Sequence, residues 1–372
     1  MLKPWQALAV ILLAATTFAV YGIARPDIDG FDGYAFLNQA CGGKAVEGQP
    51  ILADITLKAM PCSIPAIKGV LFALFALTLL GIASLGSLFH EQKGWLAAAF
   101  SFLSPALVFE AVKFENDQFA TPLIIWALYF FYKARQTKDY RLDFAALALL
   151  VAAAGFWYGA VYVLLAFALT SITLIVPGIA AMAIYNGKLI GNLIPNANVV
   201  EAMPGTGLAM MAGLVFAFNS IPKAMIPQAA VFFVLAALQI KFAWLIIPIL
   251  SVAMAILYAS KQHRLVEQAK PVFFTMSLLL VVAWGFALTG HPPHPHQWQA
   301  VEYAIEKSPD GFVWSDWDYG YWVEYKGGTA SQAGGGRQYE HGSGIVLTRG
   351  FLQDTKGCEL LKKFEDTEVW WC

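Results

Sequence analysis

The residues of this sequence best suited to chemistry are acids at the ends of long apolar runs and one segment rich in both aromatic and acidic residues. The acids fall into three groups: Asp29 and Asp32, Glu115 and Asp117, and Glu201. A hard divalent cation such as Mg²⁺ or Mn²⁺ prefers several carboxylate oxygens that converge from different parts of a chain. These acids are therefore candidate metal ligands. The alternative is that they only solvate the ends of helices, which is the usual role of carboxylates in loops.

The aromatic and acidic segment covers residues 314–322, where Asp316 and Asp318 lie among tryptophans and tyrosines. An aromatic belt at a membrane interface would account for the rings, but not for the two aspartates. A pocket that stacks a ligand and accepts its hydrogen bonds would use both kinds of side chain. The composition of this segment favours a binding pocket over a belt.

Composition indicates the class of protein that must position these residues. The 372 residues are 58% hydrophobic and 13% charged, and the mean hydropathy is +0.59. That leaves too little polar surface to solvate a globule of this size, so we expect lipid to cover most of the chain. The net charge of −1 provides no broad positive field for a nucleic-acid backbone, and we expect no nucleic acid among the partners.

Apolar runs predict the membrane helices, because about 20 such residues cross about 30 Å of hydrocarbon. We expect spans near residues 5–24, 65–89, 95–109, 119–132, 225–240, 242–259 and 272–289. The long apolar stretch 142–192 divides into three short helices, and another helix is expected at 207–221. The prediction is an α-helical polytopic membrane protein with about eleven transmembrane helices.

Basic residues in short loops predict the orientation. One loop contains Lys133, Arg135, Lys138 and Arg141, and another contains Lys261, Arg264 and Lys270. Both loops should face the cytoplasm. With the amino terminus inside, alternation puts residues 25–64, 110–118, 193–206 and everything after 290 on the outer face. The first apolar run could instead be a secretory signal, since Lys3 precedes it and small residues end it.

The chain divides into a transmembrane domain, residues 1–290, and a small extracytoplasmic α/β domain, residues 291–372, where the sequence becomes polar. We expect strands at 311–314 and 344–347 and a helix at 359–364. His291, His294 and His296 alternate with prolines. They fit an extended proline-rich linker or a metal site, and we favour the linker.

All four cysteines fall in segments assigned to the outer face: Cys41, Cys62, Cys358 and Cys372. An oxidising compartment would let Cys41 pair with Cys62 and Cys358 with Cys372, each within its own loop. Four free thiols are the alternative. The sequence leaves both open.

The segment Trp317-Asp318-Tyr319-Gly320 resembles the Trp-Trp-Asp-Tyr-Gly signature of the catalytic subunits of oligosaccharyltransferases, membrane enzymes that glycosylate asparagine in Asn-x-Ser/Thr sequons. Other segments resemble motifs of this family and follow in the family's order. They are Asp32-Gly33-Tyr34-Ala35-Phe36, Ser104-Pro105 with Phe114-Glu115-Asn116-Asp117, Gly155-Phe156-Trp157-Tyr158-Gly159, and Val199-Val200-Glu201-Ala202-Met203-Pro204. The resemblance runs from about residue 20 to about residue 330, and the bacterial and archaeal single-subunit enzymes are the most similar.

The resemblance implies roles for individual residues. Four acids, Asp32, Glu115, Asp117 and Glu201, would surround Mg²⁺ or Mn²⁺ and the acceptor amide. Trp317 and Asp318, with Tyr319 and Asp316 beside them, would form the acceptor pocket. Lys241 would lie where the family has an arginine that binds the phosphate of the lipid-linked donor.

The implied protein is a metal-dependent, inverting glycosyltransferase of the GT-C membrane fold in a prokaryotic plasma membrane, active on the extracytoplasmic face. It would transfer a glycan from a polyprenyl phosphate or diphosphate to asparagine of an acceptor protein. The chain departs from the family where Asp316 replaces the first tryptophan of the signature, where the acids of the second loop are exchanged, and in its shorter external domain. Two alternatives follow: the same chemistry on a different acceptor, such as a lipid or cell-surface polymer, or a non-catalytic membrane subunit.

Overall fold

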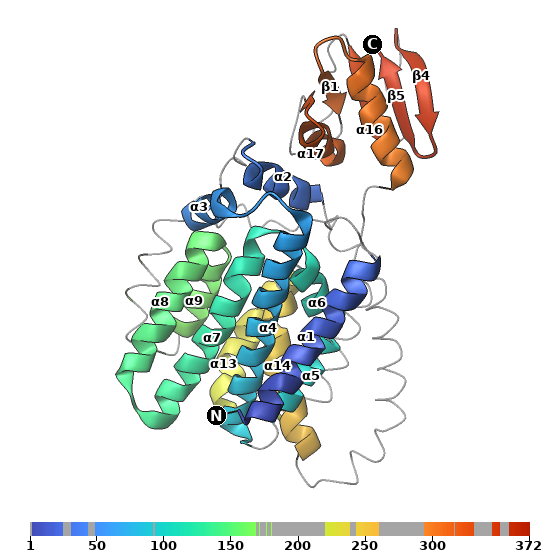
Figure 1. Ribbon diagram of the computed structural model, residues 1–372. Helices are drawn as coiled ribbons and strands as arrows, with labels where there is room; N and C mark the ends of the chain where they lie inside the picture. Colours follow the sequence, from blue (N-terminus) through green and yellow to red (C-terminus); the bar gives the residue numbers. More distant parts are fainter. Residues whose placement is uncertain are drawn as a thin grey trace. The chain divides into compact units, whose positions relative to one another are not determined.

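The protein is described from a computed structural model (Figure 1). It describes residues 2–24, 31–43, 49–91, 94–168, 171, 176, 180, 220–238, 243–259, 294–315, 317–330, 344–349 and 357–372. The chain forms two compact units. The first unit comprises Met1–Pro26, Gln49–Asp54 and Lys68–Thr289, and the second comprises Asp27–Gly48, Ile55–Ile67 and Gly290–Cys372.

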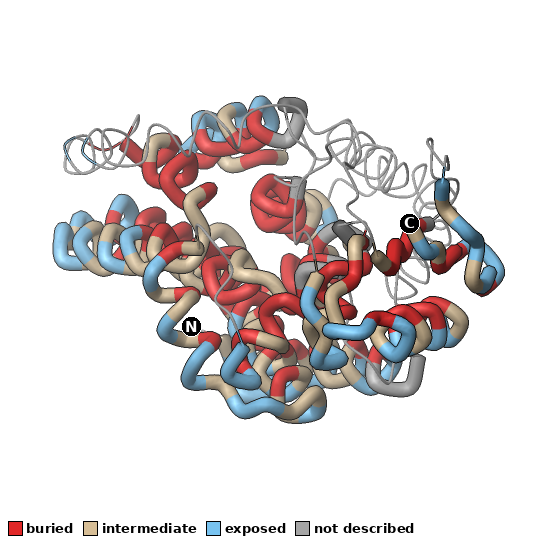
Figure 2. Tube along the Cα trace, turned by 90° about the horizontal axis from the view of Figure 1, so that it is seen from above, coloured by how far each residue is buried: buried red, intermediate tan, exposed pale blue. Residues whose placement is uncertain are grey.

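The first unit is helical throughout its described part. Its helices are α1 (Pro4–Ala24), α4 (Ile64–Phe89), α5 (Gly94–Phe102), α6 (Pro105–Val112), α7 (Asn116–Thr137), α8 (Tyr140–Phe156), α9 (Ala160–Ala168), the 3₁₀ turn η2 (Lys223–Met225), α13 (Ile226–Leu238) and α14 (Ala243–Ala259). Helix α7 packs on α8, and α14 packs on α5 and α13. The core is mostly alanine, leucine, isoleucine and valine, and Trp244, Tyr21 and Tyr132 are among its largest members. Figure 2 shows buried and exposed stripes on opposite sides of the same helices, as expected where one side packs against neighbours.

Two helices in the described residues are long and apolar enough to cross a membrane. They are Pro4–Tyr21 within α1 and Ile64–Phe89, which is α4. Lys223–Leu235 and Trp244–Ala259 are apolar but shorter. The full set of eleven spans remains a prediction.

Two of the predicted helices are observed as predicted, and a third is divided into two. Helices α1 and α4 confirm the helices predicted at 5–24 and 65–89. The single helix predicted at 95–109 is wrong, because α5 ends at Phe102 and α6 begins at Pro105. Proline lacks the N–H that a continuing helix needs and favours the first helical position instead.

The long apolar stretch is only partly described. Helices α8 and α9 lie within it as far as Ala168. The spans expected at 207–221 and 272–289 lie outside the described residues, except for Ser220 and Ile221.

The turn between α7 and α8 carries the first basic loop. Lys138 ends α7 in the left-handed conformation, with φ of 57°. Asp139 caps α8 by accepting a hydrogen bond from the backbone N–H of Arg141 at 3.0 Å. Arg135 pairs with Asp143 at 2.6 Å across the turn. The two helices are thus held as a tight antiparallel pair.

The second unit contains the only sheet in the described residues. Its elements are α2 (Phe31–Ala40), part of α3 (Ile51–Ala59), α16 (Pro295–Lys307), β1 (Phe312–Ser315), α17 (Trp317–Tyr325), β2 (Thr329–Ala330), β3 (Ile345–Arg349), β4 (Glu359–Phe364) and β5 (Thr367–Trp371). The strand order is β2-β1-β3-β5-β4. Strand β1 is parallel to β2 and β3, whereas β5 is antiparallel to β3 and β4. Helix α16 packs against β1, β3, β4 and β5 (Figure 1).

The carboxyl-terminal hairpin corrects one prediction. The segment Glu359–Phe364, predicted as a helix, is strand β4, which pairs with β5. Glu365 has φ of 51° and with Asp366 forms the turn between these strands. Strand β5 is rich in β-branched and aromatic residues, which favour a sheet, and its pairing overrides the local charge pattern of β4.

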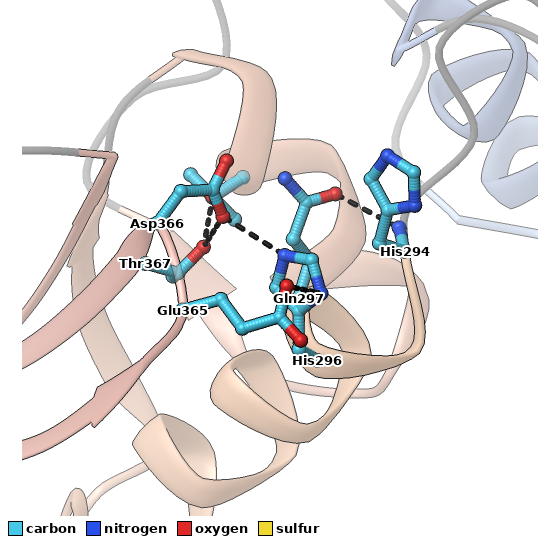
Figure 3. A network of polar contacts seen from close by, with 7 residues as sticks. His294, His296, Gln297, Glu365, Asp366 and Thr367 are labelled. Carbon is cyan, nitrogen blue, oxygen red and sulfur yellow. Dashed lines mark hydrogen bonds and ion pairs between the residues drawn. The ribbon is translucent and has the colours of Figure 1, made fainter.

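The histidines expected in a linker lie at the start of α16 instead (Figure 3). His294 precedes the helix, and its backbone N–H donates to the side-chain oxygen of Gln297 at 2.9 Å. The ring nitrogens of His296 lie 3.2 Å from Glu365 and 2.9 Å from Asp366. The linker prediction is therefore wrong for residues 294–296, and His291 lies outside the described residues.

All four cysteines are in disulfides. Cys41 is bonded to Cys62 and Cys358 to Cys372. Both bonds lie in the second unit, which includes the segments Asp27–Gly48 and Ile55–Ile67. Up to residue 64 these segments belong to the external loop 25–64 that was predicted as part of the first domain. The second unit is therefore built from three stretches of chain.

Candidate functional site

The acidic loop, residues 110–118, connects the end of α6 to the first turn of α7. Glu115 occupies the position before the helix with extended backbone angles, and its carbonyl accepts from the backbone N–H of Gln118 at 3.3 Å. Asp117 lies in the first turn of α7. A carboxylate there is favoured by the positive end of the helix dipole.

Lys113 lies between two carboxylates of this loop. Its Nζ is 3.3 Å from Oε1 of Glu110 and 3.7 Å from Oε1 of Glu115. Burial lowers the pKa of the Lys113 ammonium, but the charges of Glu110, Glu115 and Asp117 outweigh it and raise the pKa above its usual range. The carboxylates of this loop thus favour the charged form of Lys113.

Glu110 has a second partner. Its Oε2 accepts from the side-chain amide of Gln118 at 3.3 Å. Both residues are buried, and they line a cavity of about 10 Å³ between α4, α6 and α7, with Leu74, Phe75, Thr78, Leu107, Ala111 and Thr121. That volume is about enough for one water molecule. It is too small for a substrate.

Asp117 presents a buried oxygen with no hydrogen-bond partner in the described part of the chain. This oxygen is Oδ1, and Oδ1 of the neighbouring Asn116 is also buried without a hydrogen-bond partner in the described residues. A buried carboxylate oxygen without a donor is costly, and a cation would satisfy it. The donor chemistry therefore fits a hard divalent cation, although no group of three or more His, Cys, Asp or Glu side chains in the described residues could hold one.

The motif helix, α17, begins with the Trp-Asp-Tyr-Gly motif directly after β1. Tyr319 is 1% exposed, and its hydroxyl is 2.6 Å from that of Thr367 in β5. The ring of Tyr319 meets that of Trp322 edge to face at 5.2 Å. Within the motif, Tyr319 therefore belongs to the core that holds the helix on the sheet.

Helix α2, which carries Asp32, packs on the motif helix. Tyr34 is 1% exposed, and its ring lies 5.2 Å from Tyr325, 5.3 Å from Trp298 and 6.5 Å from Trp322. Such edge-on aromatic contacts add stabilisation beyond the burial of their area. The aspartate segment and the motif helix thus share one aromatic core.

The remaining predicted site residues are described to different extents. Asp32 lies in the first turn of α2, and Trp317 and Asp318 in that of α17, where only the backbone is described. Asp316, Glu201 and Lys241 lie outside the described residues.

The glycine motif at 155–159 ends α8. A Cβ at Gly155 would come within 2.6 Å of Leu52 in α3. Only a residue without a side chain lets the two segments approach so closely. This part of the motif serves packing.

Sequence reasoning missed the residues that connect Glu115 to the buried side of the loop. Neither Glu110, Lys113 nor Gln118 was among the candidate site residues. A signal was present, because Glu110 and Lys113 are three apart, the spacing at which an ion pair forms on a helix, within an otherwise apolar region.

Comparison with known proteins gives a match in structure alone. No protein-family model matches the sequence, and no curated protein matches it either. Among solved structures, the fold is similar to that of the Archaeoglobus fulgidus oligosaccharyltransferase, with a TM-score of 0.54 at 13% identity over 88% of this chain. The chain has an oligosaccharyltransferase-like fold.

The matched structure contains an acceptor peptide with an NVT sequon, tethered through a disulfide bond, and this chain spans 64% of its length. A second structure of the same protein, in complex with zinc and sulfate, matches with a TM-score of 0.54 at 14% identity. The match covers 91% of this chain and 68% of that one. At this identity the likeness extends to the oligosaccharyltransferase-like fold alone.

Proposed function

We propose that this protein is an oligosaccharyltransferase that moves a glycan from a polyprenyl phosphate or diphosphate to asparagine of an acceptor protein on the outer face of a prokaryotic plasma membrane. The observation that carries the proposal is the likeness of fold to an oligosaccharyltransferase over 88% of the chain. The ordered motifs support it independently, because they were read from the sequence alone.

The acids of the acidic loop have the chemistry that the reaction needs. In our proposal Glu115 and Asp117, together with Asp32 and Glu201, bind Mg²⁺ or Mn²⁺. When bound, the ion supplies positive charge that neutralises the departing phosphate. The buried Oδ1 of Asp117 supports this role, because a cation would satisfy it.

Asp32 and Glu201 would also polarise the acceptor amide, whose nitrogen is a poor nucleophile. Attack by that nitrogen on the anomeric carbon would invert its configuration. Lys241 would bind the donor phosphate as a point charge, without the two-pronged geometry of an arginine. Trp317 and Asp318, with Asp316 beside them, would hold the hydroxyl of the acceptor's Ser or Thr.

The burial of Tyr319 and Trp322 supports a rigid acceptor pocket. A pocket remote from the reacting atoms contributes to catalysis only if it holds the acceptor in a fixed position. The aromatic core around Tyr34 would give the motif helix that rigidity. Tyr319 would then act through packing.

The test is transfer of a lipid-linked glycan to a fluorescent Asn-x-Thr peptide by the purified full-length protein. A matched Gln-x-Thr peptide is the control for the acceptor, and chelator followed by Mn²⁺ is the control for the metal. We expect a mobility shift of the first peptide alone, lost with chelator and restored by Mn²⁺. Absence of transfer to any acceptor would refute the proposal.

A second candidate keeps the donor and the chemistry but changes the acceptor to a lipid, a cell-surface polymer or another side chain. It is favoured by Asp316, which stands where the family signature has tryptophan. In the same assay, transfer to such an acceptor without a shift of the Asn-x-Thr peptide would select this candidate.

A further inference from the structure

Glu110 and Glu115 share one lysine. The ammonium of Lys113 is closer to Glu110, at 3.3 Å, than to Glu115, at 3.7 Å. The two carboxylates also differ in exposure, since the side chain of Glu110 is 7% exposed and that of Glu115 is 25% exposed. Glu110 is therefore the closer and more deeply buried of the two partners of Lys113.

Glu110 is itself fixed in place. Gln118 donates to its other oxygen at 3.3 Å, and apolar side chains line the cavity beside it. The arrangement joins Gln118, Glu110, Lys113 and Glu115 in one chain of contacts.

We propose that Glu110 is a positioning residue that holds the ammonium of Lys113 away from Glu115 and so limits competition between this lysine and a divalent cation for the Glu115 carboxylate. The inference rests on the proposed function, in which Glu115 is a metal ligand. Of the two carboxylates that pair with Lys113 in the described part of the chain, only Glu115 would remain without Glu110. An ammonium drawn onto Glu115 occupies its oxygens and repels a cation.

The main test is Mn²⁺ binding to the purified full-length protein, measured by electron paramagnetic resonance of free Mn²⁺. Glu110→Gln keeps the size and one acceptor oxygen, but it replaces the carboxylate that pairs with Lys113 by a neutral amide. We expect its Mn²⁺ affinity to fall roughly tenfold, because groups in direct contact couple by about that factor. Glu91→Gln, the same change at an exposed position, should bind Mn²⁺ as the wild type does.

The double variant Glu110→Gln/Lys113→Met decides between positioning and a general structural role. If Glu110 acts by holding Lys113, removing the lysine as well restores Mn²⁺ affinity to within about threefold of the wild type. Lys113→Met alone should not weaken binding. If the pair only maintains the loop, Lys113→Met and the double variant will bind Mn²⁺ as weakly as Glu110→Gln, and the inference is overturned.

A second variant guards against misfolding. Should Glu110→Gln fail to fold in a thermal unfolding assay, Gln118→Met, which removes one hydrogen bond to Glu110 and keeps the volume, should lower Mn²⁺ affinity by a smaller factor in the same direction. If the variant that folds binds Mn²⁺ as tightly as the wild type does, the inference about Glu110 is overturned, but the proposed function is not. If the wild-type protein itself binds no Mn²⁺, both the inference and the proposed metal dependence are overturned.

The same variants give a kinetic signature in the transfer assay. Because saturating Mn²⁺ displaces the ammonium, Glu110→Gln should raise the Mn²⁺ concentration for half-maximal rate and leave the maximal rate nearly unchanged. A loss of maximal rate without a change in Mn²⁺ dependence contradicts a positioning role toward the metal.

Discussion

In the acidic loop of the first unit, Lys113 lies between Glu110 and Glu115, whereas in the second unit rings surround the motif helix, with Tyr34, Tyr319 and Trp322 almost fully buried. The loop is held by charge inside an apolar bundle, and the motif helix by packing in a small sheet domain. In the proposed function, the carboxylate of Glu115 exchanges the lysine for a divalent cation, and the motif helix must keep the shape of the acceptor pocket. Substitutions in the acidic loop should therefore reduce activity, whereas substitutions around the motif helix should reduce the stability of the fold.

The largest expected effect is on activity, from Asp117→Asn in the acidic loop. Losing a charged ligand of a divalent cation should lower the rate of glycan transfer by about 100-fold or more. The temperature of unfolding should stay near that of the wild type, because the amide fills the same space. Transfer and thermal unfolding measured on one preparation check this. A folded variant that retains full activity would remove Asp117 from the site.

Trp322→Ala in the motif helix should have the opposite profile. Removing a side chain that is 1% exposed leaves a cavity in the aromatic core, and the free energy of unfolding should fall by about 3–5 kcal/mol. Limited proteolysis and thermal unfolding of the full chain measure the effect. Trp371→Ala is the matched control, since Trp371 is 42% exposed and should have a much smaller effect.

The disulfide at the end of the sheet tests how far the second unit depends on covalent support. Cys358 and Cys372 flank the β4–β5 hairpin at a separation of 14 residues. Replacing both by alanine should lower the free energy of unfolding by about 3 kcal/mol. Thermal unfolding with and without reductant measures it. Reductant should then affect the double variant less than the wild type, and an equal effect on both would mean that this disulfide contributes little.

The smallest expected effect is on acid stability, at Asp310 before β1. Its carboxylate accepts hydrogen bonds from the backbone N–H of Phe312 and the hydroxyl of Ser308, each at 3.0 Å, and these lower the pKa of Asp310. A carboxyl whose pKa is lower in the folded state contributes stability above its unfolded pKa and loses it as the pH falls through the folded pKa. Asp310→Asn should therefore reduce the loss of stability below about pH 4. Thermal unfolding measured between about pH 2 and about pH 7, in steps of about one pH unit, checks this.

The sequence predicted the long helices and the small sheet domain, because apolar length and a change in composition are local signals. It failed at two places where a single proline or a tight turn decides the local structure. Pro105 lies inside an apolar run and divides it into α5 and α6. Glu359–Phe364, predicted as a helix, pairs with β5 across the turn at Glu365 and Asp366.

Parts of the candidate site also had local signals in the sequence. The positions of Glu115 and Asp117 at the start of α7 follow from where an apolar run begins. Glu110 and Lys113 are three residues apart, so their ion pair also had a local signal. The packing of α2 on the motif helix joins segments from opposite ends of the chain, and this contact has no signature in one local stretch of sequence.

The aromatic core around Tyr34 has a consequence for synthesis. Tyr34 is made early, whereas its ring partners Trp298, Trp322 and Tyr325 are made only after most of the chain. Helix α2 therefore has no aromatic partners to pack against while the helices of the first unit are synthesised and assemble. Contacts so distant in sequence form slowly, because a long loop must close first. A chain stalled on the ribosome before residue 298 would thus contain the helices of the first unit, but its second unit could not fold, because most of that unit would not yet have been synthesised.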